Sequence, residues 1–533
     1  MTRRIKKRKI AAMILNKTTI HRTLLLLGVF VLGACAAPRP AVGFQSDGFS
    51  RPAAREVIAA GFENITERYI VAIGAETFAP EGLRGLGAID PEFAIEKSAN
   101  ELLVKIGANV ITRMTLPDNG DTDAWTDLVI DVVVMSRSHS KELALASPEK
   151  IYEAIFDGIL SHLDIYSRYA GIKEAARNRA KRDGFGGIGI RFKMVGGQPL
   201  ITRVLPKTPA LRAGLKINDV ITAIDGDPTT GLLRNTIGER LRGPVNSHAL
   251  LRVRRGNGKE PMEFNLERIH IVPQTVSYAQ TGGVVYLKIS SFNRGTAQEV
   301  LKKMKKANRQ LGPNLKGVIL DMRGNPGGLL KQSIEVADLF LAQGKISQTS
   351  GRHPDSVQRY EAGGRDMAFG KPIIVLLDGM SASASEVTAA ALQDRGRAVV
   401  VGTSSFGKGT VQTILRLPND GEMTLTWSRL MAPSGYIIHE LGVFPTICTA
   451  GASGDGSALF DDIPAQRIRT SAVLEAWHRV GFEDKKGRQD LRAFCPPERR
   501  SLATDSKIAR RLIENKALYT RMLNLTAAAA AAR

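Results

Sequence analysis

The spacing of hydrophobic residues changes several times along the chain, and each change predicts a different kind of structure. Apolar residues recur at helical intervals from Glu56 to Ile70 and from Pro148 to Leu163. The stretch from Trp125 to Met135 is more continuously apolar, which predicts a strand or another buried segment. We therefore expect a mostly helical N-terminal domain over residues 55–180.

The pattern beyond this domain changes from β to mixed α/β. Residues 183–271 hold short β-branched runs separated by Gly, Pro and Asn, with one helix expected near Leu233 to Leu241. From 275 to 448 apolar strands alternate with helical stretches, which predicts a sheet covered by helices. Residues 449–533 are charged and mostly helical in pattern. The predicted fold class is multidomain α+β: a helical N-terminal domain, a β domain, an α/β core and a helical C-terminal extension.

The chain is strongly basic, with a formal net charge of +22 over 533 residues. Residues 1–34 carry eight Lys or Arg and no acid, so 66 basic and 52 acidic residues remain beyond them, a net charge of +14. No basic helix with interleaved aromatic residues is present, and we expect no nucleic-acid partner. No C-x-x-C or H-E-x-x-H spacing occurs, so we expect neither a metal nor a cofactor.

The first 34 residues have the pattern of a targeting segment. A basic stretch precedes the apolar run Leu24 to Leu32, which is too short to span a bilayer as a mature helix. The run ends in Leu-Gly-Ala-Cys35, which resembles the lipobox of bacterial lipoprotein signal peptides and implies cleavage before a lipid-bearing Cys35. An ordinary signal peptide or an uncleaved anchor is the alternative, and Met13 is an alternative start. Residues 35–54, rich in Pro, Gly and Ala, are the expected tether.

Export also bears on the two remaining cysteines. With Cys35 lipidated, Cys448 and Cys495 form an even pair in an oxidising compartment. A disulfide between them and two unrelated buried thiols are both compatible with the sequence, because pairing requires a Cα separation that a sequence does not contain.

The richest chemistry lies between Pro372 and Ile414. An apolar strand leads into Ser-Ala-Ser-Ala-Ser at a helix start, and after a second strand Lys408 stands between two glycines. Serine with lysine is an established nucleophile–base pairing. Burial lowers the pKa of a lysine from about 10.4, which allows the amine to accept a proton near neutral pH. Taken singly, however, the serines could be helix caps and the lysine a surface charge.

The β domain has a recognition pattern of its own. The segment TPALRAGLKINDVITAIDG, from Thr208 to Gly226, resembles the middle of a PDZ domain. In PDZ domains a Gly-rich loop binds a terminal carboxylate and the adjoining strand edge adds the peptide as another strand. The residues that this resemblance places at a peptide-binding groove are Gly186, Gly187, Ile188, Gly189, Ile190, Ile237 and Leu241.

Four motifs in one order resemble the C-terminal processing peptidases, also called tail-specific proteases. They are LDIYSRY (163–169), DMRGNPGG (321–328), SASASEVTAAALQDRGRAVVVG (381–402) and FGKGTVQ (406–412), within a resemblance that runs from about 55 to 448. The resemblance implies a ClpP- or crotonase-like core in which Ser383 is the nucleophile and Lys408 the base. It also implies that Gln412 orients the lysine. The family usually has a proline and a second histidine or serine where Ile165 and Tyr166 stand here, a difference that we expect to lie outside the catalytic pair.

The chemistry that follows is acyl transfer. Ser383 attacks a peptide carbonyl, and the oxyanion is stabilised by the Ala384 N–H together with the N–H of Gly327 or Gly328. Water then hydrolyses the acyl-enzyme.

Our leading hypothesis is a lipid-anchored serine endopeptidase on the periplasmic side of a bacterial envelope. Its expected partners are proteins or peptides with exposed C-terminal tails, with an adaptor protein and a homo-oligomer left open. The alternatives are a non-catalytic PDZ scaffold that binds envelope-protein tails and, less well supported, a crotonase-like enzyme acting on acyl-CoA.

Overall fold

The computed structural model describes residues 48–256, 258, 260–364, 366–452, 463–499 and 503–531. The predicted signal peptide, Cys35 and most of the predicted tether lie outside the described residues. The predicted end of the tether at residue 54 is wrong, because helix α1 (Arg51–Arg68) already begins at Arg51. None of the helices in the described ranges is both long and apolar enough to cross a membrane.

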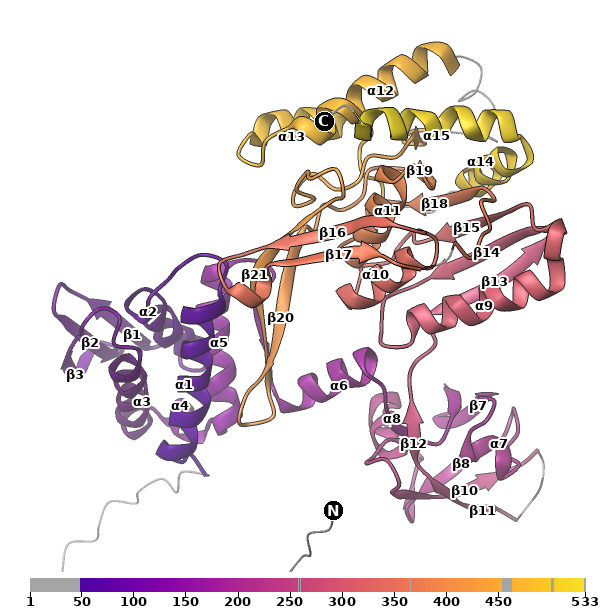
Figure 1. Ribbon diagram of the computed structural model, residues 1–533. Coiled ribbons are helices and arrows are strands. Elements are labelled where there is room, and N and C mark those ends of the chain that lie inside the picture. Colours follow the sequence, from indigo (N-terminus) through magenta and orange to yellow (C-terminus); the bar gives the residue numbers. More distant parts are fainter. Residues whose placement is uncertain are drawn as a thin grey trace, which may run out of the picture. The chain divides into compact units, whose positions relative to one another are not determined.

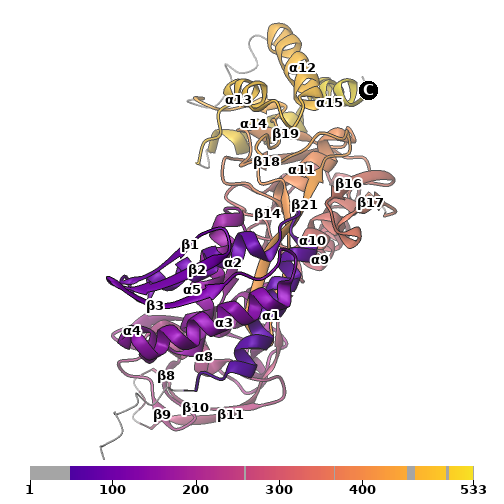
Figure 2. The same ribbon diagram turned by 90° about the vertical axis from the view of Figure 1, so that its left-hand side faces the viewer.

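The N-terminal region combines helices with a small sheet. Of the two alternatives for Trp125 to Met135, a strand or another buried segment, the structure shows the second: these residues belong to helix α3 (Thr122–His139), which buries Trp125 and Val129 and whose start is capped by the Asp121 carboxylate. The run is apolar because this helix packs against α1 and other neighbours, as Figure 2 shows. The sheet was not expected from the sequence. The other elements are α2 (Ala75–Gly85), α4 (Lys141–Leu145), α5 (Pro148–Leu163), β1 (Phe93–Lys97), β2 (Glu101–Ile106) and β3 (Asn109–Thr115).

A long hairpin from the α/β core completes the N-terminal hydrophobic core. Strands β20 (Thr410–Arg416) and β21 (Glu422–Met431) form this hairpin, and Leu417, Met423 and Leu425 pack among the buried residues of the N-terminal helices. Strand β4 (Arg168–Ala170) pairs with β21. The segment just after α5 is therefore joined by backbone hydrogen bonds to the hairpin that follows Lys408.

The β domain follows helix α6 (Ile172–Arg182). A sheet of order β11-β10-β8-β7-β6 surrounds an aliphatic core that contains Ile201, Ile221 and Leu251. Its elements are β5 (Phe185–Gly187), β6 (Ile190–Val195), β7 (Gln198–Val204), α7 (Pro209–Arg212), β8 (Val220–Ile224), β9 (Asp227–Pro228), α8 (Arg234–Leu241), β10 (His248–Arg254), β11 (Met262–Glu267) and β12 (Ile269–Ile271).

The α/β core is a six-stranded sheet of order β13-β14-β15-β18-β19-β22, parallel from β14 onward. One face packs against α9 (Thr296–Leu311), α10 (Leu330–Asp338) and α11 (Ala384–Asp394). The other face packs against α14 (Ala503–Glu514) and α15 (Lys516–Ala531), which lie over β18 and β19 (Figure 1). Burial of both faces explains the unbroken apolar run of β18. The elements are β13 (Val276–Thr281), β14 (Val284–Ile289), β15 (Gly317–Asp321), β18 (Ile373–Leu377), β19 (Val399–Gly402), β22 (Ile447–Cys448), α9 (Thr296–Leu311), α10 (Leu330–Asp338) and α11 (Ala384–Asp394).

A second sheet and four C-terminal helices complete the chain. The sheet has the order β17-β16-β21-β20, so β20 is an edge strand. A disulfide joins Cys448 to Cys495, with 5.9 Å between their Cα atoms. The predicted fold class, multidomain α+β with a helical C-terminal segment, is confirmed. The remaining elements are β16 (Gly344–Ser350), β17 (Gln358–Ala362), α12 (Ile463–Arg479), α13 (Lys485–Ala493), α14 (Ala503–Glu514) and α15 (Lys516–Ala531).

Candidate active site

The geometry distinguishes Ser383 from its two neighbouring serines. The Ser381 hydroxyl donates to the Met322 carbonyl and that of Ser385 to the Asn325 carbonyl, and both side chains are fully buried. Ser383 instead precedes the first residue of α11 and lines a cavity of about 510 Å³. Its φ of 55° is unusual for a residue other than glycine, so the chain accepts backbone strain at this serine.

The same cavity brings most of the predicted catalytic residues together. It is lined by Ser383, Lys408, Gln412, Gly327 and Gly328. Ala384 is fully buried behind this surface, at the start of α11. The cavity also has a positively charged rim, because Arg168, Lys181 and Arg182 contribute to its lining.

Lys408 has the electrostatic environment of a proton acceptor. Burial lowers the pKa of its ammonium and the nearby Arg168 lowers it further, whereas Asp164 and Glu386 act in the opposite direction. No hydrogen bond within the described residues joins Lys408 Nζ to Ser383 Oγ or to Gln412. The Nζ atom lies instead 4.8 Å from the centre of the Tyr166 ring.

A series of side-chain hydrogen bonds holds the Gln412 amide in place. Its Nε2 donates to Thr410 Oγ1 at 2.9 Å and to Thr426 Oγ1 at 3.3 Å. Thr426 Oγ1 donates in turn to Asp164 Oδ1 at 3.1 Å. The amide nitrogen is thereby occupied, which leaves Oε1 as the atom able to accept from a lysine.

Of the two glycines predicted for the oxyanion site, one has its N–H engaged. The Gly327 N–H donates to Asn325 Oδ1 at 2.9 Å. For the N–H groups of Gly328 and Ala384 the described part of the chain shows no acceptor. A Cβ on Gly328 would lie 2.1 Å from the Phe292 carbonyl oxygen, and the residue has a φ of 142°, so only glycine fits here. A Cβ on Gly327 would lie 2.9 Å from that of Ser383, which shows how closely this loop approaches the serine.

Comparison with known proteins shows to what the chain is related. The model of Peptidase family S41 matches residues 283–449, and that of the PDZ domain matches residues 186–266. A Carboxy-terminal-processing protease of Bartonella bacilliformis is 34% identical over 340 residues, covering 63% of this chain and 78% of that protein.

The chain belongs to peptidase family S41.

The chain is also similar to a second bacterial relative and to a solved structure. A CtpA-like serine protease of Staphylococcus aureus is 32% identical over 304 residues, covering 56% of this chain and 60% of that protein. The solved structure of the photosystem II D1 C-terminal processing protease is 23% identical, with a TM-score of 0.34 over 58% of this chain and 87% of that one. The two family models and the relative in B. bacilliformis show that the S41 chain described here is a serine peptidase with a PDZ domain.

The structure adds a residue to the site that the sequence analysis missed. Glu386 is fully buried, and its carboxylate accepts hydrogen bonds from the backbone N–H groups of Ser383, Gly407 and Lys408 and from the Ser405 hydroxyl, at 2.5–2.9 Å. Burial raises the pKa of this carboxyl and the four donors lower it. One side chain therefore fixes the backbone at both ends of the predicted dyad. The spacing Ser-x-x-Glu from Ser383 is a capping-box signal that could have identified it.

Tyr166 corrects a second expectation. The motif that contains it was expected to lie outside the catalytic pair, but its ring contacts the Lys408 ammonium. Pairing of β4 with β21 carries this segment to the cavity.

The PDZ groove contains most of its predicted residues. A cavity of about 190 Å³ is lined by Gly187, Ile188, Gly189, Ile190 and Leu241. Two predicted residues do not line it. Gly186 pairs with His270 of β12, and Ile237 is fully buried in the core of the domain. The pairing of β5 with β12 sets the position of Gly186, and the orientation of α8, which the sequence pattern alone did not give, turns Ile237 into the core.

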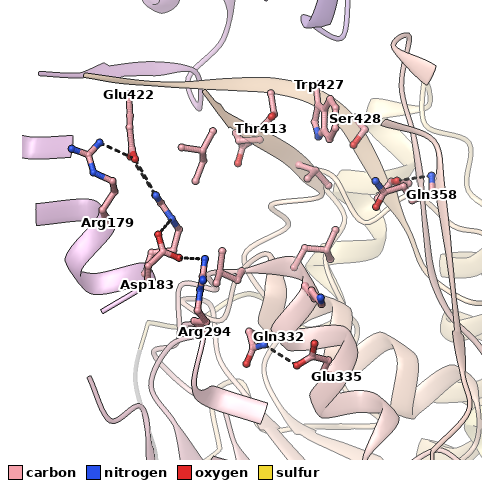
Figure 3. Close-up of a pocket in the computed structure, with 18 of the residues that line it drawn as sticks. Arg179, Asp183, Arg294, Gln332, Glu335, Gln358, Thr413, Glu422, Trp427 and Ser428 are labelled. Atoms are coloured by element: carbon pink, nitrogen blue, oxygen red, sulfur yellow. Dashed lines mark hydrogen bonds and ion pairs between the residues drawn. The ribbon is translucent and has the colours of Figure 1, made fainter. Parts of the chain in front are cut away.

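A larger cavity of about 890 Å³ adjoins the active site of the S41 core and is lined in part by β20. It shares Leu329, Leu330, Val411 and Gln412 with the cavity at Ser383. Figure 3 shows its charged side, where Glu422 accepts from Arg179 at 3.2 Å and from Arg182 at 3.0 Å, and Asp183 pairs with Arg294 at 2.9 Å. The edge of β20 therefore faces a continuous space on one side of the serine.

The C-terminal extension, beyond the part matched by the S41 model, holds the loops on either side of the site. Arg492 Nη2 donates to the Ser405 carbonyl at 3.1 Å, in the loop that leads to Lys408. The Glu498 backbone carbonyl accepts from Gly379 N at 2.8 Å, in the loop that leads to Ser383. Cys495 lies between Arg492 and Glu498 in the sequence, and its disulfide to Cys448 anchors this segment to β22.

Reduction of this disulfide is expected to lower the free energy of unfolding by ~2–4 kcal/mol, because the cross-link restricts the unfolded chain. The sequence separation of 47 residues is long enough for an effect of this size. Catalytic activity should fall together with stability, since the segment holds both loops. Urea unfolding and turnover would be measured with and without a thiol reductant. A Cys448→Ala, Cys495→Ala variant is the control and should not respond to the reductant; equal effects of reductant on both proteins would contradict the prediction.

Proposed function

We propose that this S41 peptidase is a periplasm-facing, lipid-anchored endopeptidase that recognises C-terminal tails through its PDZ domain and cleaves by a Ser–Lys mechanism. The observation that carries the proposal is the arrangement of Ser383, Lys408 and Gly328 around one cavity beside the free edge of β20. The lipobox-like sequence at Cys35 supports the location and the anchor.

The mechanism begins with Lys408 as the neutral amine. Nζ accepts the Ser383 hydroxyl proton while Oγ bonds to the carbonyl carbon of the scissile peptide. The resulting oxyanion accepts hydrogen bonds from the N–H groups of Gly328 and Ala384. The carbon–nitrogen bond then breaks, and the Lys408 ammonium returns the proton to the departing amine.

Deacylation repeats these steps with water. Lys408 accepts a proton from the water that attacks the ester, and the ammonium then protonates Ser383 Oγ as the acyl group leaves as a carboxylic acid. Gln412 Oε1 accepts a hydrogen bond from the ammonium and orients it between these steps. The lysine must move from the Tyr166 ring toward Ser383 for the first step.

The substrate is held at two places in this proposal. Its C-terminal residues bind beside the Gly187–Ile190 loop, where the strand edge and the loop N–H groups match an extended peptide with a terminal carboxylate. Its scissile segment lies along β20, whose edge can add another strand. Because the PDZ groove is small and most of the residues that line it are Gly, Ile, Phe or Leu, an apolar tail is favoured.

Cleavage of an unfolded reporter should depend on its last residues. We expect a reporter that ends in apolar residues to have at least a tenfold higher kcat/KM than one ending in aspartates, a difference of about 1.4 kcal/mol. The difference should appear mainly in KM, because the tail is bound away from the reacting atoms. Initial rates for both reporters, and for Ser383→Ala as a background control, test this.

The same two reporters also distinguish the proposed peptidase from the alternative of a non-catalytic scaffold. Tail binding by the wild-type protein without any cleavage would favour a non-catalytic PDZ scaffold. Equal cleavage of both reporters would leave a peptidase but contradict tail recognition.

A further inference from the structure

The ammonium of Lys408 has one aromatic contact that belongs to neither the dyad nor the oxyanion site. Its Nζ lies 4.8 Å from the centre of the Tyr166 ring, within the range of a cation–π interaction. In the described residues it makes no hydrogen bond to Ser383 Oγ or Gln412. In this structure the Lys408 ammonium therefore interacts with the Tyr166 ring and not with the Ser383 hydroxyl.

Hydrogen bonds of its own turn and a contact with His439 hold the Tyr166 ring in place. Asp164 Oδ1 accepts from the backbone N–H of Tyr166 at 2.7 Å and of Ser167 at 2.9 Å. The Ser167 hydroxyl accepts from Thr426 N at 3.0 Å, which fastens the turn to β21. The His439 ring packs edge-on against Tyr166 at 6.0 Å between ring centres. The neighbouring Ile165 is 87% exposed, so the turn presents Tyr166, not Ile165, to the lysine.

The charged groups around this contact partly oppose one another. Asp164 and Glu386 favour the charged form of Lys408, and Arg168 disfavours it. Burial raises the pKa of Tyr166, and Glu386, Glu440 and Asp164 raise it further, whereas burial lowers the pKa of His439 and favours its neutral form. The Tyr166 ring is uncharged, and its face lies against the Lys408 ammonium.

We propose that Tyr166 is a positioning residue for Lys408: its ring face holds the protonated side chain in a resting position, and loss of the proton releases the amine toward Ser383. This inference rests on the proposed Ser–Lys mechanism. An ammonium is attracted to the face of an aromatic ring, and a neutral amine is not, so the proton itself controls the release.

A leucine at this position keeps apolar bulk but has no aromatic face. The Tyr166→Leu variant should therefore destabilise only the charged form of Lys408 and move the acidic limb of kcat/KM to lower pH by roughly 0.4–1.5 units. The Tyr166→Phe variant keeps the ring and should retain the wild-type limb. A merely structural role would lower activity at all pH values without moving the limb.

The experiment has two readouts, so that its outcome is separable from that of the proposed function. The first is the pH profile of reporter cleavage for the wild type, Tyr166→Phe and Tyr166→Leu. The second is NMR titration of ¹³C-lysine-labelled Ser383→Ala protein carrying the same substitutions, with the Lys408 signal assigned by its loss in Lys408→Arg. This titration needs no turnover.

Each combination of the pH profile and the NMR titration either supports or overturns the proposal. A lower Lys408 pKa in the leucine variant, with the phenylalanine variant unchanged, supports the proposal. An unchanged Lys408 pKa in folded Tyr166→Leu protein overturns it, whether or not the chain cleaves peptides. A Lys408 shift without any turnover by the wild type would retain the contact and overturn the peptidase mechanism.

Discussion

Replacing Ser383 with alanine is expected to lower kcat/KM for an unfolded reporter by at least ~10⁴-fold, because the variant cannot form an acyl-enzyme. Lys408→Ala should lose a comparable factor, since the variant lacks the amine proposed to accept the hydroxyl proton. The two residues act as a unit, so the double variant should be no slower than either single variant. Reporter cleavage and active-site labelling with a serine-directed phosphonate would measure these losses.

The neighbouring residues provide matched controls for this prediction. Ser381→Ala and Ser385→Ala remove hydroxyls that donate to backbone carbonyls, so they should reduce stability more than the chemical step. Lys316→Ala removes an exposed lysine and should leave cleavage unchanged. If Ser383→Ala retained the wild-type rate, or if only Ser381→Ala abolished labelling, the assignment of the nucleophile would be wrong.

The second large effect is expected from Glu386→Gln, which keeps the size of the side chain and removes one acceptor oxygen. The carboxylate accepts four hydrogen bonds in a fully buried position. An amide NH₂ facing two of those donors leaves them unpaired, at ~1–3 kcal/mol each, so the free energy of unfolding should fall by about 2–6 kcal/mol.

Activity of Glu386→Gln should also fall, because Ser383 and Lys408 lose their common attachment. A displacement of about 1 Å between reacting groups can cost ~10²-fold, and we expect a loss of at least this size in kcat. Denaturant unfolding and turnover below the unfolding transition test the two effects separately. As a control, Glu299→Gln alters a partly buried glutamate on α9 and should leave kcat nearly unchanged. A folded Glu386→Gln protein with wild-type kcat would show that the carboxylate has no positioning role.

The sequence by itself determined the fold class and the serine peptidase family. Helical and alternating periodicity reflect local contacts within one element, so they predicted the core strands and α11. The motifs around Ser383 and Lys408 predicted a serine peptidase with a PDZ domain, which the family comparison confirms. At Trp125–Met135 the same local pattern left the type of element open, because an apolar run buried by neighbours does not distinguish a helix from a strand.

Only the tertiary structure decided how the separate motifs meet. Tyr166 contacts Lys408 because β4 pairs with β21, and Glu386 binds two distant backbone segments because the carboxyl ends of β18 and β19 are adjacent. Which glycine N–H is available at the oxyanion site depends likewise on the conformation of the Asn325 loop. These are contacts between residues far apart in the chain. No periodicity along the sequence encodes them, because they arise only when sheet pairing brings the segments together.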